Sequence, residues 1–411
     1  MTDSPFVLRN LAAFDHDARR FNSGVDILCD RGRIVAIGPG LPAPAEALEV
    51  DASGLFALPG LIDCHVHISS SGAPGDLNRA GEDPVAIRAL KAAQHARVTL
   101  DAGFTTVRDL GAPAHLNVHL SRAIADGLIE GPSILAAGMG VTMTGGHGHG
   151  FLAREADGPD DVRKAVREQL RAGATAIKLF ASGGVMTAGV DPRSPSFTLE
   201  ELTAGVEEAH KAFRVVASHA QATDGIKNAV RAGVDSIEHG VWLDEEAIGL
   251  MLERGTYLVA TLTAPYVMAT ATAEDGVADY MVEKSNAVLD AHFESFRAAV
   301  RAGVRIAMGT DQGTPLNRPG ENVQEILRMW ENGLSAAPAL LSATAWAADL
   351  LRIAEDRGRL LPGLAADIII VRGDPLADIS ILARPAQFAA VIKSGRFIRA
   401  ALPGVPERGT A

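Results

Sequence analysis

The chain has 411 residues, of which 47% are hydrophobic and 21% are charged, an ordinary globular balance that argues against extensive disorder. Its 38 basic and 50 acidic side chains give a formal net charge of −12, which disfavours nucleic acid and anionic membranes as partners. The length accommodates one large α/β domain with a smaller one, or about two to three ordinary domains.

The N-terminal sequence and the cysteines indicate the cellular compartment of the protein. The N-terminal stretch "MTDSPFVLRN" lacks the basic and then apolar pattern of a signal peptide, and no run of about 18 apolar residues predicts a membrane span. Cys29 and Cys64 are the two cysteines, too few for a disulfide scaffold and too far apart for a CxxC site. We therefore expect a cytoplasmic protein in a reducing compartment.

Short strand patterns occupy both ends of the chain. They are "FVLRNLAAF", "GVDILCDRGRIVAIG" and "ALEVDASG" near the start, and "LLPGLAADIIIVRGDP" and "AAVIKSGRFIRA" near the end. Because short β segments need a shared core, we expect one small β-sandwich built from both termini rather than two separate appendages. The predicted boundaries are 1–55 and 361–411 for the two parts of the sandwich and 56–360 for the domain between them.

A helix, a glycine and a strand recur between these ends. Glycines 103, 173, 233 and 303 each follow a helical stretch, such as 160–173, and precede a β-rich run, with a variant at Gly255. Eight strands are expected near 56–66, 105–110, 132–137, 175–181, 214–218, 235–238, 257–262 and 304–309. Repeated α-then-β units predict a parallel sheet of the α/β class, and eight of them predict a (β/α)₈ TIM barrel. A doubly wound sheet is the alternative, but GxGxxG and GxxxxGK[ST] are both missing.

Metal-ligand residue types stand at the ends of the predicted strands. In "LIDCHVHI" the side chains of His65 and His67 share one face, together with Asp63, because alternate strand residues point the same way. Since the carboxyl ends of barrel strands open onto one face, we expect six residues to meet there and bind metal: His65, His67, Lys178, His219, His239 and Asp311.

Each of these residues also has an ordinary explanation when it is considered alone. Lys178 could pair with a carboxylate, His219 or His239 could be a hydrogen-bonded core histidine, and Asp311 could cap the following helix. Their joint occurrence on successive strand ends favours the metal site.

A glycine-rich loop, "GGHGHG" at 145–150, follows the third predicted strand. Its glycines would let the backbone approach a ligand, so His147 or His149 could hydrogen-bond a substrate carbonyl or oxyanion; a flexible surface turn is the alternative. The remaining histidines are expected on surfaces or helices: His16, His95, His115, His119, His210 and His292.

The pattern resembles the amidohydrolase superfamily over nearly the whole chain, through the terminal sandwich, the motif "LPGLIDCHVHI" and the K…H…H…D order. It is most similar to the branch with a lysine in strand four and to its imidazolonepropionase-like and prolidase-like members, through "DAGFTTVRDLG", "GGHGHG" and "IKLFASGGVMT". The resemblance implies two divalent metal ions, usually zinc, bridged by a carboxylated Lys178. His65, His67 and Asp311 would bind the more buried metal, and His219 and His239 the more exposed one. Asp311 would also transfer protons, and the match to "TGGHG" favours His147 over His149 as the second catalytic residue.

The expected function is that of a binuclear metal-dependent amidohydrolase. It would cleave the amide bond before a C-terminal amino acid in dipeptides or N-acyl amino acids, including Xaa-Pro dipeptides and amides of the ochratoxin A type. The partners would be a small-molecule substrate and, by resemblance, further copies of the chain, with an octamer as one form. One alternative is ring opening of a cyclic amide, as imidazolonepropionase performs, and another is a metal-free scaffold, which the complete ligand set disfavours. A serine hydrolase is disfavoured because GxSxG is missing.

Overall fold

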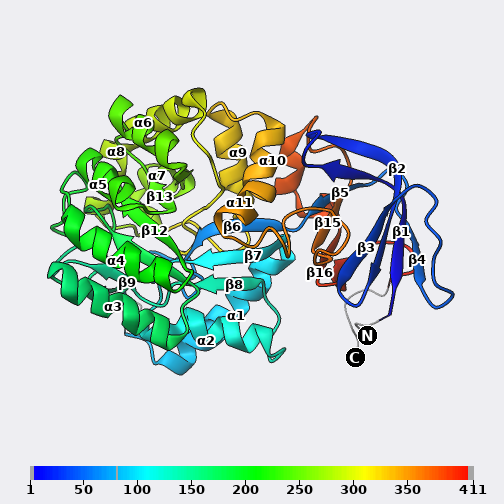
Figure 1. Cartoon of the computed structure of the whole chain (residues 1–411), viewed down its shortest axis with the longest axis horizontal. Helices are drawn as coiled ribbons and strands as arrows, with labels where there is room; N and C mark the ends of the chain where they lie inside the picture. The colour runs from blue at the N-terminus through cyan, green and yellow to red at the C-terminus, as the bar shows by residue number, and fades with distance from the viewer. Residues whose placement is uncertain (1–3, 80–81, 406–411) are drawn as a thin grey trace. The chain divides into compact units, whose positions relative to one another are not determined.

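The computed structural model describes residues 4–79 and 82–405 (Figure 1). Its contacts divide the chain into two compact units. One comprises Met1–Ile62, Thr99–Thr106 and Leu334–Ala411, and the other comprises Asp63–Val98 and Val107–Gly333. The predicted boundaries at 55/56 and 360/361 stay predictions. Within the described residues, no helix is both long enough and apolar enough to cross a membrane.

The first unit contains a sheet built from both ends of the chain. The strands follow the order β17-β16-β15-β5-β1-β2-β3, with β4 also paired to β1. Their bounds are Phe6–Asp15 (β1), Arg20–Asp30 (β2), Arg33–Gly38 (β3), Leu48–Asp51 (β4), Phe56–Pro59 (β5), Ile368–Val371 (β15), Phe388–Lys393 (β16) and Arg396–Ala400 (β17). Side chains from both termini share one apolar core, including Leu8, Ile27, Ile368 and Ile392. The expectation of one terminal sheet domain is confirmed.

The first predicted barrel strand, 56–66, is in fact two strands that separate at Gly60. β5 pairs with β1 and β15 in the terminal sheet, and β6 (Leu61–Val66) begins the second sheet system. A Cβ at Gly60 would lie only 2.2 Å from Thr105 Oγ1, so the chain can change sheets here only with glycine. The sequence pattern hid this break because both halves are apolar.

The remaining strands lie in the second unit, except that the first residues of β6 and β7 belong to the first. A six-stranded sheet has the order β10-β9-β11-β12-β13-β14 with parallel pairs throughout, and β6-β7-β8 form a three-stranded sheet. The bounds are Phe104–Asp109 (β7), Ser133–Ala136 (β8), Gly140–Thr142 (β9), Ala153–Glu155 (β10), Ala176–Phe180 (β11), Val215–Ala220 (β12), Ser236–His239 (β13) and Tyr257–Val259 (β14).

Backbone hydrogen bonds join these strands into a ring. The segment 304–309 is not a regular strand, yet it bonds to β14 on one side and to β6 on the other. The bonds outside the six-stranded sheet include Leu110 N to Val66 O, Ala137 N to Asp109 O, Thr175 N to Ala136 O, Ala307 N to Leu258 O, and Cys64 N to Met308 O. The eight predicted positions therefore follow one another around a TIM barrel, as expected.

Helices alternate with the barrel strands, and glycines end several of them. The helices are Val85–Asp101 (α1), Leu116–Ala125 (α2), Gly158–Ala172 (α3), Leu199–Lys211 (α4), Thr223–Ala232 (α5), Glu245–Arg254 (α6), Thr263–Ala269 (α7), Asp279–Ala302 (α8), Val323–Glu331 (α9), Ala336–Ser342 (α10) and Ala345–Leu350 (α11). Short 3₁₀ helices lie at Pro113–His115, Ala273–Asp275, Ile379–Ala383 and Pro385–Gln387. Gly173, Gly233 and Gly303 directly follow α3, α5 and α8 with φ of 103°, 95° and 82°, the left-handed conformation predicted for them.

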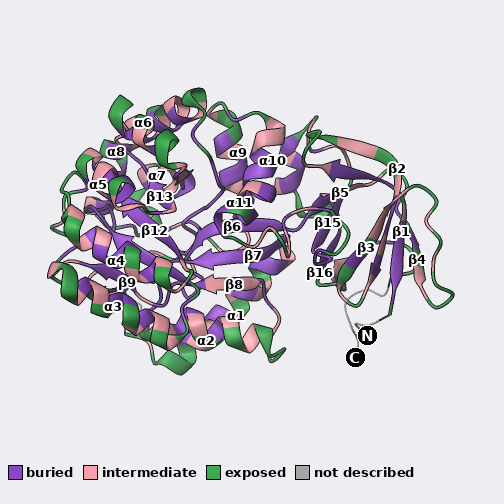
Figure 2. Cartoon of the chain, in the orientation of Figure 1, coloured by how far each residue is buried: buried purple, intermediate pink, exposed green. Residues whose placement is uncertain are grey.

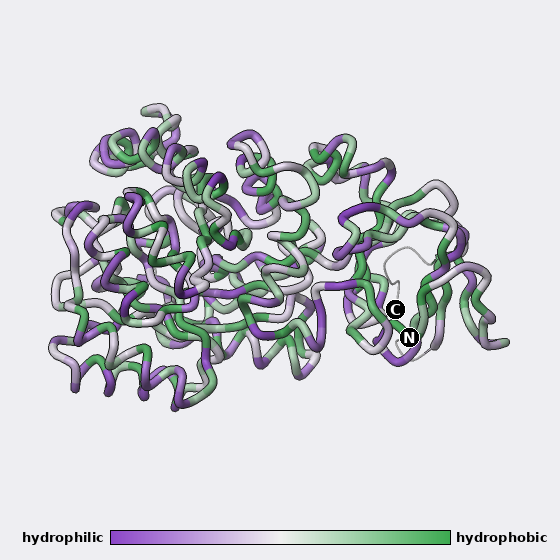
Figure 3. Tube along the Cα trace, turned by 45° about the horizontal axis from the view of Figure 1, so that its top comes forward, coloured by the Kyte–Doolittle hydropathy of each residue, from purple (hydrophilic) through white to green (hydrophobic). Residues whose placement is uncertain are grey.

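Each helix of the barrel buries one face. In α3 the buried residues Val162, Ala165, Val166 and Gln169 recur at the spacing of a helical stripe. Figure 2 shows this division, with buried strands and with helices that are part buried and part exposed, and Figure 3 shows the matching alternation of hydropathy along the same helices. Strands with no exposed face carry the candidate site residues at their ends.

Candidate active site

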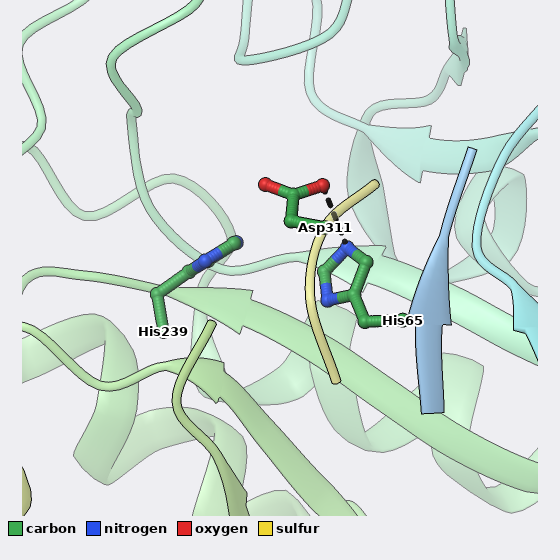
Figure 4. A group of neighbouring side chains, drawn as sticks. All are labelled: His65, His239 and Asp311. Atoms are coloured by element: carbon green, nitrogen blue, oxygen red, sulfur yellow. Dashed lines mark ion pairs between the residues drawn. The ribbon is translucent and has the colours of Figure 1, made fainter. Parts of the chain in front are cut away.

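The six residues that were predicted to meet are all buried in the second unit, and Lys178 lies in the middle of β11 rather than at its end. Asp311 Oδ1 lies 3.3 Å from His65 Nε2 and 3.2 Å from His67 Nε2. One potential ligand atom from each of His65, His239 and Asp311 falls within 4.8 Å of the others, and Figure 4 shows these three side chains converging.

His219 extends this cluster toward the glycine-rich loop. Its ring centroid lies 4.5 Å from that of His239 and 4.5 Å from that of His147. Residues from three strands, from the segment that carries Asp311 and from one loop therefore surround a common centre, although they are far apart in the sequence.

Lys178 has an unusual environment for a lysine. It is 1% exposed, and its Nζ has no hydrogen-bond partner within the described residues. Burial lowers the pKa of its amine from 10.5 to about 8, although the nearby Glu238 and Asp311 act in the opposite direction. A buried polar atom without a partner is costly, so this nitrogen is suited to chemistry beyond an ordinary ion pair.

Hydrogen bonds fix which ring nitrogen of three histidines faces the centre. His65 Nδ1 lies 2.8 Å from Glu238 Oε2, His67 Nδ1 lies 3.0 Å from the Gly111 carbonyl, and His219 Nε2 lies 2.8 Å from the Gly183 carbonyl. A carbonyl or carboxylate oxygen can only accept, so each of these nitrogens carries the proton. When the ring is neutral, the other nitrogen keeps its lone pair, and this is the form in which histidine binds metals.

Glu238 and Arg108 form a buried ion pair behind His65. Both side chains are fully buried, and Arg108 Nη2 donates to Glu238 Oε1 at 2.9 Å. Arg108 Nε also donates to the Cys64 carbonyl, and Ser236 Oγ donates to Glu238 Oε1 at 2.5 Å. Sequence reasoning did not single out either residue, although an acid inside "SIEHG" and an arginine inside "TTVRDLG" are charges within buried strands and could have been a signal.

The sequence predicted only the direction of the Asp63 side chain. In the structure its carboxylate holds neighbouring segments of the site together. It accepts from the backbone nitrogens of His65 and Thr310, from Thr310 Oγ1 and from Asn322 Nδ2. These bonds tie the end of β6 to the segment that carries Asp311.

The backbone is strained where the strands end. His239, Thr261 and Asp311 have φ of 72°, 53° and 59°, values that residues with a side chain rarely adopt. Thr261 Oγ1 lies 2.7 Å from His239 Nδ1, so two of these positions also contact one another. Strain of this kind gathers at functional sites.

A small cavity of about 30 Å³ opens beside the cluster. It is lined by His147, Val185, Met186, His219, Gln221, His239, Val241, Ala264, Pro265, Met268, Val288, His292 and Asp311. His149 does not line it; its Nδ1 instead lies 2.7 Å from the Gly146 carbonyl. Burial lowers the pKa of the His147 imidazole to about 3, and the charge of Lys178 adds to this effect, so the ring stays neutral at physiological pH.

His292 differs from its expected role. It lies on a helix, α8, as expected, but it is 1% exposed and lines the cavity, where its Nε2 lies 2.9 Å from the His239 carbonyl. No motif in the surrounding sequence marks His292, because only the fold brings this part of α8 to the site. The other five histidines of that group do not line the cavity.

The donor set fits metal ions. Imidazole lone pairs, the Asp311 carboxylate and an amine without a partner converge in a region that is shielded from water, and imidazole and carboxylate are the ligands of zinc and related divalent ions. The backing of His65 by a carboxylate and of His67 and His219 by carbonyls is typical of metal-binding histidines.

Comparisons with known proteins identify the family of the chain. The profile of the Amidohydrolase family matches residues 56–398. Ochratoxinase from Aspergillus niger is 33% identical over 380 residues, 85% of this chain and 76% of that protein. Imidazolonepropionase from Cereibacter sphaeroides is 28% identical over 413 residues, 90% of this chain and 94% of that protein. The crystal structure of a Xaa-Pro dipeptidase with methionine bound in its active site superposes with a TM-score of 0.87 at 35% identity, covering 96% of this chain and 99% of that one. The chain belongs to the amidohydrolase family, a metal-dependent family, and is a hydrolase that acts on amide bonds.

Proposed function

We propose that the chain is a binuclear metal-dependent hydrolase that cleaves the amide bond before a C-terminal amino acid, in dipeptides or N-acyl amino acids. The observation that carries this proposal is the set of three histidines whose ring tautomers are fixed with a lone pair left free beside Asp311 and Lys178. The similarity to a Xaa-Pro dipeptidase and to ochratoxinase supports the substrate class.

The residues divide into two ligand groups in this proposal. His65, His67 and Asp311 hold one ion, since the Asp311 carboxylate contacts both rings. His219 and His239, whose rings lie together on neighbouring strands, hold the second. As a carbamate, which forms when its neutral amine adds to CO₂ and releases a proton, Lys178 would supply oxygen ligands to the ions. The orphaned Nζ supports this assignment, because a carbamate supplies oxygen ligands where an ammonium would repel a cation.

The bound ions, which we propose to be zinc, would activate a water molecule and polarise the amide carbonyl. Asp311 accepts the proton that the water loses and delivers it to the departing amine. His147 donates a hydrogen bond to the carbonyl oxygen as negative charge develops on it. Its ring is held by Thr187 Oγ1, 2.8 Å from Nδ1, which leaves Nε2 on the side of the cavity.

The apolar wall of the cavity suits a hydrophobic side chain on one side of the scissile amide. Its apolar lining includes Val185, Met186 and Met268. An aromatic acid joined to an amino acid, as in ochratoxin-type amides, combines such a group with a free carboxylate.

The direct test is amine release from a panel of dipeptides and N-acyl amino acids, together with metal analysis of the purified protein. We expect about two metals per chain, hydrolysis of at least one panel member, and loss of more than nine-tenths of turnover in Lys178→Ala, with partial rescue by small carboxylic acids. Well under one metal per chain, with no gain on adding zinc, would reject the proposal.

Ring opening of a cyclic amide is the second candidate, and the similarity to imidazolonepropionase favours it. Imidazolone and hydantoin substrates distinguish it. Turnover of these, without amine release from any N-acyl amino acid, would replace the first proposal with this one.

A further inference from the structure

A second and larger cavity adjoins the candidate active site. It measures about 430 Å³ and is formed by the loop 189–193, by Trp242 and by one face of α8. Val288 lines both cavities, and Val241 of the smaller one is the chain neighbour of Trp242 in the larger one. The two cavities therefore adjoin one another along α8.

The smaller cavity contains no cation that could pair with a substrate carboxylate. Its lining includes neither lysine nor arginine, and its one neutral amide is that of Gln221. A substrate with a free carboxylate must find its charged partner elsewhere, or at the metal ions.

The larger cavity offers two cations, and one of them is already committed. Lys284 Nζ lies 2.7 Å from the Thr187 carbonyl, 2.5 Å from that of Val190 and 3.5 Å from that of Gly184. An ammonium group has three N–H donors, so these three acceptors use them all. Lys284 therefore braces the loop between β11 and α4.

Arg193 is the cation that remains. Its guanidinium carbon lies 4.9 Å above the centre of the Trp242 ring, and within the described residues its side chain makes no hydrogen bond and no ion pair. Stacking on an aromatic face holds the guanidinium plane in position while its N–H edge stays free. That edge matches the two oxygens of a carboxylate.

Two acidic residues also line the larger cavity, and their negative charge affects the binding of an anion there. Asp191 Oδ1 accepts from the backbone nitrogen of Arg193 at 2.8 Å, which orders the turn, and Glu283 is exposed on α8. Neither pairs with the guanidinium, but both lower the local attraction for an anion. Glu283 therefore provides a variant with the opposite expected effect.

We infer that Arg193, stacked on Trp242, is the subsite that binds the free carboxylate of the substrate's C-terminal amino acid. This inference rests on the proposed amide hydrolysis and names the contact that selects acids over neutral amides. Binding of an amino acid can be measured without turnover, so the two claims can be tested separately.

The test is calorimetric titration of the metal-loaded protein with L-phenylalanine and with L-phenylalaninol, which differ in the carboxylate. We expect Arg193→Gln to weaken L-phenylalanine binding about tenfold or more, Arg193→Lys to weaken it less, and both to leave L-phenylalaninol within about twofold. Glu283→Gln should tighten L-phenylalanine about twofold. Arg19→Gln is the matched control, because Arg19 is an exposed arginine stacked on Trp346 at 5.9 Å in the other unit, and it should change neither titration.

Several results would overturn the inference: no carboxylate-dependent binding by the wild-type protein, carboxylate-dependent binding that Arg193→Gln leaves intact, or equal losses for both ligands. Kinetics on N-benzoyl-L-phenylalanine separate the two claims. If the wild-type protein releases no amine while the Arg193-dependent binding holds, the proposed function fails and the subsite stands. If hydrolysis proceeds and Arg193→Gln leaves the KM for the acid unchanged, the subsite fails and the function stands.

Discussion

At the scale of single residues, the candidate centre depends on a side chain that would not touch the metals. Glu238 accepts from His65 and neutralises the fully buried Arg108. We expect Glu238→Gln to lower metal affinity about 10- to 100-fold, because the proton on His65 Nδ1 is held less firmly. It should also cost about 3–5 kcal/mol of unfolding free energy, since a buried guanidinium loses its partner.

Metal titration and urea unfolding check the Glu238 prediction. Glu294→Gln is the control, because Glu294 pairs on the surface with Arg301, their side chains are 60% and 62% exposed, and such pairs contribute about 0–1 kcal/mol. Unchanged metal affinity in Glu238→Gln would show that the hydrogen bond to His65 has no role in binding.

Asp311 combines two proposed roles, ligand and proton carrier, and a single substitution separates them. Asp311→Asn keeps an oxygen near both histidine rings but cannot accept the proton, so kcat should fall about 10²- to 10⁴-fold with a smaller change in KM. Steady-state kinetics on a protein of verified metal content measure this. A main effect on KM would contradict the proton-transfer role.

At the scale of elements, the loop after β11 sets the position of His147. A Cβ at Gly184 would lie 2.6 Å from His147 Nε2, so Gly184→Ala must displace the ring that we propose as the hydrogen-bond donor to the carbonyl. We expect a fall in kcat with the fold intact, as judged by circular dichroism. Gly249→Ala is the control: a Cβ there meets nothing within 4 Å inside α6, and it should stabilise the protein by about 0.5–1 kcal/mol. Equal activity in both variants would remove His147 from the mechanism.

Hydrogen bonds between Glu325 of α9 and the start of α7 predict that the free energy of unfolding depends on pH. Glu325 of α9 is 0% exposed and accepts from Leu262 N, Thr263 N and Thr263 Oγ1, and burial raises its pKa from 4.5 to about 7 in spite of these bonds. Because the folded pKa lies above the unfolded one, stability from this group is fully present below about pH 4.5. It is lost as the pH rises through about 7, to a total of about 3 kcal/mol.

Urea unfolding at pH 5 and pH 8 checks this sign. Glu325→Gln should remove most of the difference between the two pH values, whereas Glu331→Gln, at an exposed position of the same helix, should preserve it. If the change in unfolding free energy between pH 5 and pH 8 is the same in the wild type and in Glu325→Gln, the raised pKa of Glu325 is contradicted.

How far the sequence predicts these elements depends on how local their signals are. The eight strand positions and the glycines after the helices were predictable because periodicity and helix termination are local properties. The break at Gly60 was not, since only the close approach of Thr105 requires it. The six candidate ligands were predicted from a repeated position, and their role stays a prediction. Glu238, Arg108 and His292 reach the site through contacts between distant strands and helices that no local pattern encodes.

At the scale of the whole molecule, the proposed metal centre acts as a cross-link. Its ligands come from β6, β11, β12, β13 and the segment after residue 309, so one centre joins strands that span residues 61 to 311. Without bound ions the same strand ends leave a buried amine without a partner and strained backbone at His239 and Asp311. We therefore expect metal binding to couple to folding across most of the barrel.

Removal of metal should accordingly destabilise the protein. A ligand that binds only the folded state adds about 2.7 kcal/mol for each site at a free concentration 100 times its Kd. We expect chelation to lower the apparent Tm in differential scanning calorimetry and zinc to restore it. Lys178→Ala should show a smaller response to zinc, because it loses the proposed bridge, while Lys211→Ala, an exposed lysine of α4, should respond like the wild type. A Tm that neither chelator nor zinc changes would mean that the barrel folds independently of the centre, and the unpartnered Lys178 amine would then need another explanation.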